Sequence, residues 1–501
     1  MTANPLAPGW LVHPADANAL AATVWPRNAV RDAAGGIHLA GAASTALAAE
    51  FGTPLYVVDE ADASSRAAEV LDAFTSAFGA VGSTAHVYYA GKAFLSTEIA
   101  RWMTAAGLNI DVCSGGELAV ALAAGVDPVR LGFHGNNKSL AEIDRAVGVG
   151  VGAIVLDSVV EIDRVATAAE RHGRVQAVRL RINSGVHAST HEFLATAHED
   201  QKFGVPLTDV PAIVARIRSH PSLRFLGLHS HIGSQIFESD GFAEAARRLL
   251  AVHAELRAGG EVPELNLGGG FGIAYTSADA VTPIATIAEE LARVVASECA
   301  RLGIPVPDVA IEPGRVIIGP STVTLYEVGT IKDVTVSLVE PLPLVEPLPL
   351  VEPVETTGEQ VSTSSTNGGS ASSTSGTTAV RKYVSVDGGM SDNIRAALYQ
   401  ADYSVRLANR SSDATPALVR IAGKHCESGD IVVRADYLPA DVEPGDLVAV
   451  PATGAYCWSL ASNYNYLGRP AVVAVRDGHA RVIVRRETEA DLLSRDAGIT
   501  T

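Results

Sequence analysis

A lysine and two glycine-rich turns have residue types suited to binding a phosphorylated aldehyde. Lys92, in YYAGKAF (88–94), directly follows a short apolar run, and a partly desolvated lysine amine can form a Schiff base with an aldehyde. Two later apolar runs lead into NLGGGFG (266–272) and EPGR (312–315), whose bare N–H groups can bind a phosphate. Most lysines are merely exposed, and a lone glycine cluster often marks only a tight turn. The three features together predict a phosphate-bearing aldehyde cofactor.

Three further polar residues could contact such a cofactor. Glu312, beside a pyridine nitrogen, would keep that nitrogen protonated and strengthen the ring as an electron sink. His231, in HSHIGSQ (229–235), could stack on the ring, and Ser234 could donate to the phosphate. Each assignment has an ordinary alternative, because Glu312 could pair with Arg315 or another arginine and His231 could be a hydrogen-bonded core histidine.

Eight short apolar runs, with helical stretches between them, are expected to position these residues. Such runs are typical of parallel strands buried on both faces, and eight of them close a (β/α)8 barrel whose reactive groups lie at the carboxyl ends of the strands. A doubly wound open sheet is the main alternative. The runs are HVYYA (86–90), NIDVC (109–113), RLGFHG (130–135), AIVLD (153–157), AVRLRI (177–182), FLGLHSH (225–231), ELNLGGG (264–270) and VAIEPG (309–314).

The chain changes in composition after residue 315. Val- and Tyr-rich segments separated by turn residues predict a mainly antiparallel β-domain, to which TPLYVVDE (53–60) can add a strand. We therefore predict an N-terminal segment (1–60) that contributes to the β-domain, a cofactor-binding barrel (61–318) and a C-terminal β-domain (319–501). The strands of that domain are expected within 321–334, 381–389, 418–426, 445–456 and 470–487.

Residues 339–379 differ from the rest of the β-domain. They contain VEPLPL twice and then a tract rich in Ser, Thr and Gly, which cannot build a core. We predict a disordered insertion between two strands. A proline-rich ligand for a partner protein is the less favoured alternative, because no basic residues flank the prolines.

Composition and charge disfavour several classes of function. The 501-residue chain has a formal net charge of −18, whereas nucleic-acid and anionic-membrane surfaces need clustered Lys and Arg. No apolar run approaches the roughly 20 residues that span a bilayer. The first residues lack a basic start followed by an apolar stretch, and the four cysteines are widely scattered. These features predict free thiols and a cytoplasmic location.

Eight motifs, in order across residues 88–465, carry a resemblance to a known family. They are YYAGKAF, DVCSGGE, GLHSHIGSQ, NLGGGFG, EPGR, SVDGGMSDNIR, CESGD and GAYCWSLASNYN. Together they resemble the diaminopimelate decarboxylases, within the fold-type III pyridoxal-phosphate-dependent decarboxylases. The resemblance implies a barrel that binds pyridoxal 5′-phosphate and a lyase of lysine biosynthesis that converts meso-2,6-diaminopimelate to L-lysine and CO2. It also implies an obligate homodimer with shared active sites.

The resemblance assigns roles to individual residues of this chain. Lys92 matches the Schiff-base lysine, and Cys426 and Glu427 match a loop that reaches the active site of the partner subunit. Since a thiol holds its proton at pH 7, Cys426 is the candidate donor of the proton that replaces CO2. The other cofactor-binding positions match His231, Ser234, Gly269, Gly270, Glu312, Gly314, Arg315 and Tyr456. The substrate-binding positions match Arg315, Arg395, Tyr399, Glu427 and Tyr456.

Charge favours diaminopimelate over related substrates. The far end of this molecule has a carboxylate, which Arg315 and Arg395 can bind through paired N–H donors, and an ammonium, which Glu427 can bind. Ornithine, arginine and carboxynorspermidine decarboxylases are the nearest alternatives, and Arg395 argues against a purely cationic tail. Glu312 disfavours a racemase of the same fold. Intact Lys92 and Cys426 disfavour a catalytically inactive regulator.

Several remaining residues are expected to have no catalytic role. His187, His191 and His198 lie in a predicted loop without HExxH, so we predict no metal site. Ser184 stands where the family usually has proline, which is expected to loosen one turn without abolishing activity. Cys113 and Cys299 are expected to be structural.

Overall fold

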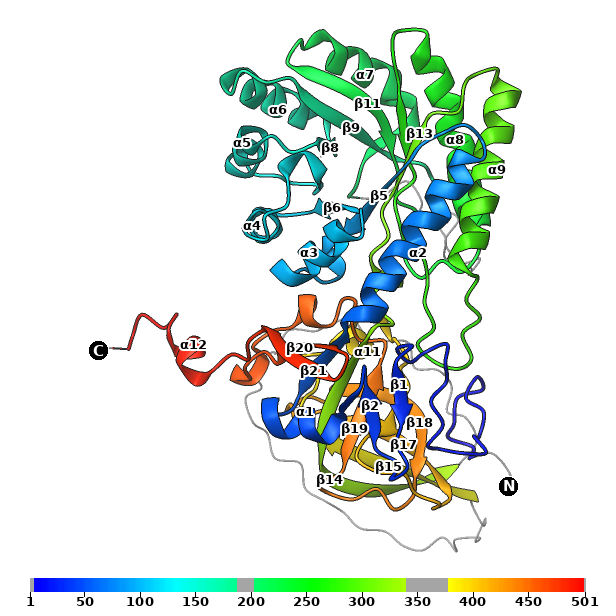
Figure 1. The fold of residues 1–501 in the computed structure, drawn as a ribbon, viewed down its shortest axis with the longest axis vertical. Coiled ribbons are helices and arrows are strands. Elements are labelled where there is room, and N and C mark those ends of the chain that lie inside the picture. The colour runs from blue at the N-terminus through cyan, green and yellow to red at the C-terminus, as the bar shows by residue number, and fades with distance from the viewer. Residues whose placement is uncertain (1–3, 187–201, 339–376, 500–501) are drawn as a thin grey trace, which may run out of the picture.

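Eight parallel strands form a closed barrel, and a second body made mostly of strands lies below it (Figure 1). The computed structural model describes residues 4–186, 202–338 and 377–499. Each barrel strand pairs in parallel with the next, and the last pairs with the first, so the open-sheet alternative is wrong. The eight barrel strands are β5 (Ala85–Ala90), β6 (Asn109–Val112), β7 (Leu131–Phe133), β8 (Ala153–Leu156), β9 (Gln176–Asn183), β11 (Leu223–His229), β12 (Glu264–Asn266) and β13 (Asp308–Ile311).

The first barrel helices begin where the sequence supplies a capping side chain, and the barrel helices pack their apolar faces on the strands. Ser96, Ser114 and Ser139 each accept a hydrogen bond from a backbone N–H in the first turn of the helix that follows. The helices around the barrel are α2 (Glu60–Gly79), α3 (Thr97–Ala105), α4 (Gly115–Ala123), α5 (Leu140–Val149), α6 (Val159–Arg171), α7 (Val210–Ser219), α8 (Asp240–Arg257) and α9 (Ile284–Leu302). No helix in the described ranges is both long and apolar enough to cross a membrane.

The β-domain combines strands from both ends of the chain. Its central strand β14 pairs antiparallel with β4, β15 and β19. Among the described strands of this domain, only β15–β17 and β4–β20 pair in parallel. The mainly antiparallel prediction is therefore confirmed. The strands of this sheet are β4 (Leu55–Asp59), β14 (Thr322–Leu338), β15 (Thr377–Val386), β16 (Arg406–Leu407), β17 (Pro416–Ala422), β18 (Ile431–Pro439), β19 (Leu447–Pro451), β20 (Ala471–Arg476) and β21 (His479–Val484).

Smaller elements complete the described chain. A separate three-stranded sheet precedes β4, and a short strand pairs with the end of β9. These elements and the remaining helices are β1 (Ala29–Arg31), β2 (Ile37–Leu39), β3 (Ala42–Ala43), α1 (Ser44–Phe51), β10 (Val205–Pro206), α10 (Arg315–Ile318), α11 (Arg395–Tyr399) and α12 (Glu489–Leu493).

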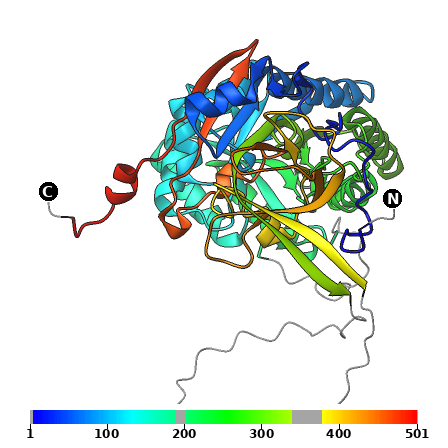
Figure 2. The same ribbon diagram turned by 90° about the horizontal axis from the view of Figure 1, so that it is seen from below.

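The proline- and serine-rich segment connects two paired strands. β14 ends at Leu338 and β15 begins at Thr377, and these two residues are partners in the ladder. The ends of both strands extend beyond the body of the domain (Figure 2). Residues 377–379 therefore belong to a strand, which corrects the end of the predicted insertion. Two predictions fall outside the described residues. One is the disorder of residues 339–376, and the other is the absence of a metal site at His187, His191 and His198.

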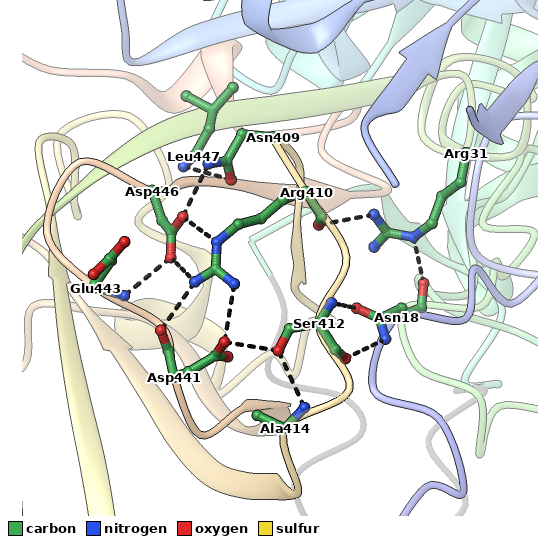
Figure 3. Close-up of polar contacts among 10 residues, drawn as sticks. All are labelled: Asn18, Arg31, Asn409, Arg410, Ser412, Ala414, Asp441, Glu443, Asp446 and Leu447. Atoms are coloured by element: carbon green, nitrogen blue, oxygen red, sulfur yellow. Dashed lines mark hydrogen bonds and ion pairs between the residues drawn. The ribbon is translucent and has the colours of Figure 1, made fainter. Parts of the chain in front are cut away.

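A polar network centred on Arg410 holds the loops of the β-domain together (Figure 3). The Arg410 guanidinium donates to both carboxylate oxygens of buried Asp446, at 2.8 and 2.7 Å, and to Asp441. On the far side of this network, Asn18 and Ser412 exchange hydrogen bonds, and Arg31 donates to the carbonyl oxygen of Arg410. The network therefore ties the N-terminal segment to the loops that precede β17 and β19.

We expect Arg410→Met to lower the free energy of unfolding by about 2 kcal/mol, because it leaves the buried Asp446 carboxylate without its bidentate partner. Chemical unfolding of the purified protein measures the change. The matched control is Arg247→Met, which removes an exposed pair with Glu244 and is expected to cost about 0.5 kcal/mol or less. Equal effects of the two substitutions would contradict the role of the network.

Candidate active site

A cavity of about 730 Å³ lies at the carboxyl ends of the barrel strands, where the barrel meets the β-domain. Lys92 enters it from the short turn Gly91–Ala93 that directly follows β5. Reactive groups of such barrels gather at this end because the strand–helix loops converge there. Ten of the predicted site residues line the cavity, namely Lys92, His231, Ser234, Gly270, Glu312, Gly314, Arg315, Arg395, Tyr399 and Tyr456.

Three predicted site residues do not line this cavity. Gly269 is buried behind the wall, where its N–H donates to His231 Nδ1 at 3.4 Å, and an added Cβ would lie 1.9 Å from the Glu312 carbonyl oxygen. Cys426 and Glu427 are exposed in the loop between β17 and β18. That loop also corrects the strand expected at 418–426, because β17 ends at Ala422.

Glu312 lies at the centre of a buried polar cluster. Its Oε1 accepts a hydrogen bond from Asn266 at 2.8 Å and lies 3.1 Å from His229 Nε2 and 3.6 Å from His134 Nε2. Burial alone would raise the pKa of Glu312, but the imidazoles of His229 and His134 outweigh it and hold the pKa well below its usual range. The carboxylate is therefore anionic at neutral pH and can stabilise a positive charge placed beside it.

Sequence reasoning missed the residues that surround Glu312. Asp111 lies 3.0 Å from His134, and burial raises its pKa to about 6. Asp111, His134 and His229 each lie at or just after the end of a barrel strand, so the strand-end rule that singled out Lys92 could also have found them. The spacing of this cluster could also hold a metal ion, because one ligand atom from each of His134, His229 and Glu312 lies within 4.8 Å of the others.

A small extension of the cavity, of about 50 Å³, lies between Lys92 and this cluster. Cys113 lines the extension, and Cys299 is buried. Although Cys113 is exposed by its accessible surface, desolvation by its neighbours raises the pKa of its thiol.

Two buried arginines face the cavity with no ionic partner among residues 4–186, 202–338 and 377–499. Arg315 donates to Tyr275 Oη and, at 2.7 Å, to Ser234 Oγ, and Arg395 donates to Tyr403 Oη at 2.5 Å. Within the described part of the chain, neither guanidinium has a carboxylate within 4.0 Å. Burying a cation costs free energy unless an anion or good hydrogen bonds compensate. The arrangement is therefore suited to binding an anionic molecule in the cavity.

Tyr456 connects the β-domain to the lysine turn. Its N–H donates to the carbonyl oxygen of Ala93 at 2.9 Å, and its ring lies 4.7 Å from the Arg315 guanidinium. It adopts a φ of 62°, a conformation that is costly for residues other than glycine and that recurs at functional sites. Contacts with the barrel therefore hold this tyrosine beside Lys92.

Glycines shape the wall next to Ser234. Gly270 has a φ of 117°, and a Cβ there would lie 2.3 Å from the carbonyl oxygen of Gly233. At Gly314 a Cβ would approach Ala90 to 3.0 Å. Both glycines line the cavity, so the approach of a phosphate to bare backbone is open at the two turns that the sequence indicated.

Comparison with known proteins identifies the family. The model described as "Pyridoxal-dependent decarboxylase, pyridoxal binding domain" matches residues 66–319, and the model of the C-terminal sheet domain of these decarboxylases matches residues 354–454. The chain belongs to the pyridoxal-dependent decarboxylase family. Within it, the chain is 50% identical to a diaminopimelate decarboxylase of Mycobacterium bovis, over 95% of this chain and 98% of that protein.

Other members of this decarboxylase family show the same likeness. The chain is 44% identical to a diaminopimelate decarboxylase of Corynebacterium efficiens, over 95% of both proteins. A crystal structure of diaminopimelate decarboxylase from M. jannaschii in complex with L-lysine has a TM-score of 0.78 and 28% identity, covering 94% of this chain and 98% of that one. The predicted fold class is therefore confirmed.

The cavity of this decarboxylase fits the pyridoxal phosphate that its family uses. Lys92 can bind the aldehyde, and the anionic Glu312 can pair with the protonated ring nitrogen. Burial lowers the pKa of His231 well below its usual value, so its ring is neutral and can lie flat against an aromatic ring. The phosphate can be contacted by the other predicted residues of this cavity wall, which are Ser234, Gly270, Gly314, Arg315 and Tyr456.

Further residues line the cavity that no local motif indicated. Trp10 comes from the N-terminal segment, and Tyr275, Asp279 and Asp402 come from loops of the barrel and of the β-domain. No spacing pattern connects these positions in the sequence. Ser184, the departure from the family pattern, is buried, and its Oγ accepts a hydrogen bond from Ser230 Oγ at 3.3 Å.

Proposed function

We propose that this chain is a diaminopimelate decarboxylase that converts meso-2,6-diaminopimelate to L-lysine and CO2. The observation that carries the proposal is the pair of buried arginines, Arg315 and Arg395, which face the same cavity as Lys92 without a carboxylate partner among the described residues. A substrate with a second carboxylate at its far end would supply that anion. The names of the relatives that cover nearly the whole chain support the same substrate.

The site residues have separate tasks in this proposal. Pyridoxal phosphate, when bound, supplies the ring that accepts the electron pair of the breaking C–C bond. Lys92 would hold the cofactor through its aldehyde until the substrate amine takes the place of the lysine amine, and Glu312 would keep the ring nitrogen protonated. The proposed substrate-orienting residues are Arg315, Arg395, Tyr399 and Tyr456, and the ring and the phosphate would be held by His231, Ser234, Gly270 and Gly314. Arg315 can also donate to the phosphate, and Gly269 would act from behind the wall by donating to His231.

Cys426 is the proposed donor of the proton that takes the place of CO2. It is exposed and does not line its own chain's cavity, so this role requires a second subunit whose active site it enters. We therefore propose a cytoplasmic homodimer in which Cys426 and Glu427 of each subunit complete the site of the other. Glu427 would bind the ammonium at the far end of the substrate.

Substrate choice is tested by measuring CO2 and lysine release. We expect the protein to decarboxylate meso-diaminopimelate in strong preference to ornithine and arginine. Arg395→Met should lower kcat/KM for diaminopimelate about 30-fold or more, because losing a buried charged partner costs about 2 kcal/mol at the least. The weak reaction with ornithine, which lacks the second carboxylate, serves as the internal control and should change much less. Faster turnover of ornithine by the unaltered protein would refute the assignment.

Shared active sites make a separate prediction about mixed dimers. Lys92→Ala and Cys426→Ala subunits should each be inactive alone, and about a quarter of wild-type activity should return after random exchange of subunits, because half of the dimers are mixed and each contains one intact site. Activity measured after mixing, beside unmixed samples treated in the same way, checks this expectation. No recovery despite subunit exchange, followed with distinguishable tags, would show that Cys426 acts in its own subunit or not at all.

A further inference from the structure

We propose that His425 and Asp430 are positioning residues that hold the Cys426 loop, defined as residues 425–430, in the conformation needed for proton return. The inference rests on the proposed function, which assigns the chemistry of this loop to Cys426 and Glu427. Both of those residues are exposed at its tip, whereas His425 and Asp430 at its two ends are buried. The buried ends are bonded to the segment that precedes Arg395.

Asp430 closes the loop and attaches it to that segment. One carboxylate oxygen accepts from the N–H of His425 at 2.7 Å, and the other accepts from the N–H of Met390 at 2.6 Å. The N–H of Asp430 donates to the carbonyl oxygen of Glu427 at 3.1 Å. The carboxylate thus joins the beginning of the loop to the neighbouring segment, which an uncharged side chain with one acceptor oxygen cannot do.

Two glycines make room for this carboxylate. A Cβ at Gly389 would lie 2.5 Å from one oxygen of Asp430, and a Cβ at Gly423 would lie 2.2 Å from the other. Real Cβ atoms do not approach an oxygen this closely, so the two chain segments can meet around Asp430 only because both positions lack side chains.

His425 fixes the other end of the loop through both ring nitrogens. Nε2 lies 2.8 Å from Ser391 Oγ and accepts from the N–H of Ser391 at 3.3 Å, and Nδ1 lies 3.0 Å from Asn465 Oδ1. Since Nε2 accepts a backbone proton, Nδ1 carries the hydrogen that faces the Asn465 oxygen. The ring also stacks on Tyr464, with centroids 5.2 Å apart and planes 25° apart.

The same contacts lead from the loop to the cavity of its own chain. The carbonyl oxygen of Ser391 accepts from the N–H of Ser462, in the segment that follows Tyr456. Four residues after Ser391, Arg395 faces the substrate region of the cavity. In the proposed dimer, the loop that completes one site is therefore anchored on the segments that build the other.

The test compares His425→Phe, which keeps a ring to stack on Tyr464 but loses both polar contacts, with His425→Gln, whose amide oxygen can still accept from Ser391. The readout is the amount of lysine formed per CO2 released by the cofactor-loaded dimer. If Cys426 failed to deliver the proton to the substrate carbon, the substrate nitrogen would remain with the cofactor, and hydrolysis would release an aldehyde in place of lysine.

We expect one lysine per CO2 in the wild type and in the control His479→Phe, which alters an exposed strand residue. His425→Phe should form clearly less than one lysine per CO2 and have a kcat about 10-fold lower, and His425→Gln should recover part of both losses. The rate of Cys426 alkylation, followed by peptide mass spectrometry, should change in His425→Phe, change less in His425→Gln and stay at the wild-type value in His479→Phe. A loaded dimeric His425→Phe with unchanged stoichiometry and alkylation would overturn the proposal.

Asp430→Asn provides a second variant if His425→Phe does not fold. It should also lower the yield of lysine per CO2, because an amide cannot accept from both His425 and Met390, and unchanged stoichiometry would count against the proposal. A wild-type protein that releases no CO2 from diaminopimelate would instead refute the proposed function. The alkylation rates of Cys426 would then still decide whether His425 and Asp430 position the loop.

Discussion

Replacing Lys92 with alanine is expected to reduce CO2 release from diaminopimelate by roughly 10³-fold or more, because the alanine side chain can neither bind the cofactor aldehyde nor exchange with the substrate amine. Lys92 is exposed to the cavity directly after β5, and the small extension next to it leads to the Glu312 cluster. The visible absorbance band of a lysine-bound cofactor should be lost as well.

The Lys92→Ala experiment needs a check on folding and a matched lysine. Lys332→Ala removes an exposed lysine of β14 and should leave both activity and absorbance at wild-type levels. The dimer and the unfolding transition should be unchanged in both variants. If Lys92→Ala keeps the visible band and substantial activity, the cofactor is held elsewhere and the proposed chemistry is wrong.

Glu312→Gln is expected to lower kcat about 100-fold while leaving KM for diaminopimelate much less affected. The substitution keeps the shape of the side chain but removes the negative charge that, in the proposed function, stabilises the protonated ring nitrogen in this low-dielectric cluster. The effect should fall mainly on kcat, because Glu312 is proposed to act on the electron sink, whereas the substrate is proposed to be oriented by Arg395 on another element.

Steady-state kinetics and the absorbance spectrum of the loaded enzyme measure this change. Glu298→Gln is the control, because that glutamate pairs with Arg301 on the surface of α9 and is expected to have no effect on kcat. An unchanged kcat in Glu312→Gln, with the cofactor fully bound, would show that the charge of the carboxylate is not needed.

Much of the barrel could be predicted because its strands are encoded locally. Each strand is a short apolar run between two helices, and such runs are buried on both faces whatever their neighbours are. The strands of the β-domain were harder to predict. The sequence did not indicate β18, and the strand expected at 418–426 ends at Ala422. The chain reverses at the Cys426 loop because Asp430 bonds to a segment about forty residues away, and no local pattern predicts that bond.

The sequence by itself determined the candidates for the chemistry: a lysine, an acid and glycine-rich turns at the ends of strands. These properties belong to the side chains and to their place after an apolar run. Only the tertiary structure decided how His134 and His229 surround Glu312, and how Trp10, Asp279 and Asp402 reach the same cavity. The physical reason is that burial and the distances between charges depend on parts of the chain that are remote in sequence. The spacing of residues along one segment therefore does not predict the burial of these groups or the distances between them.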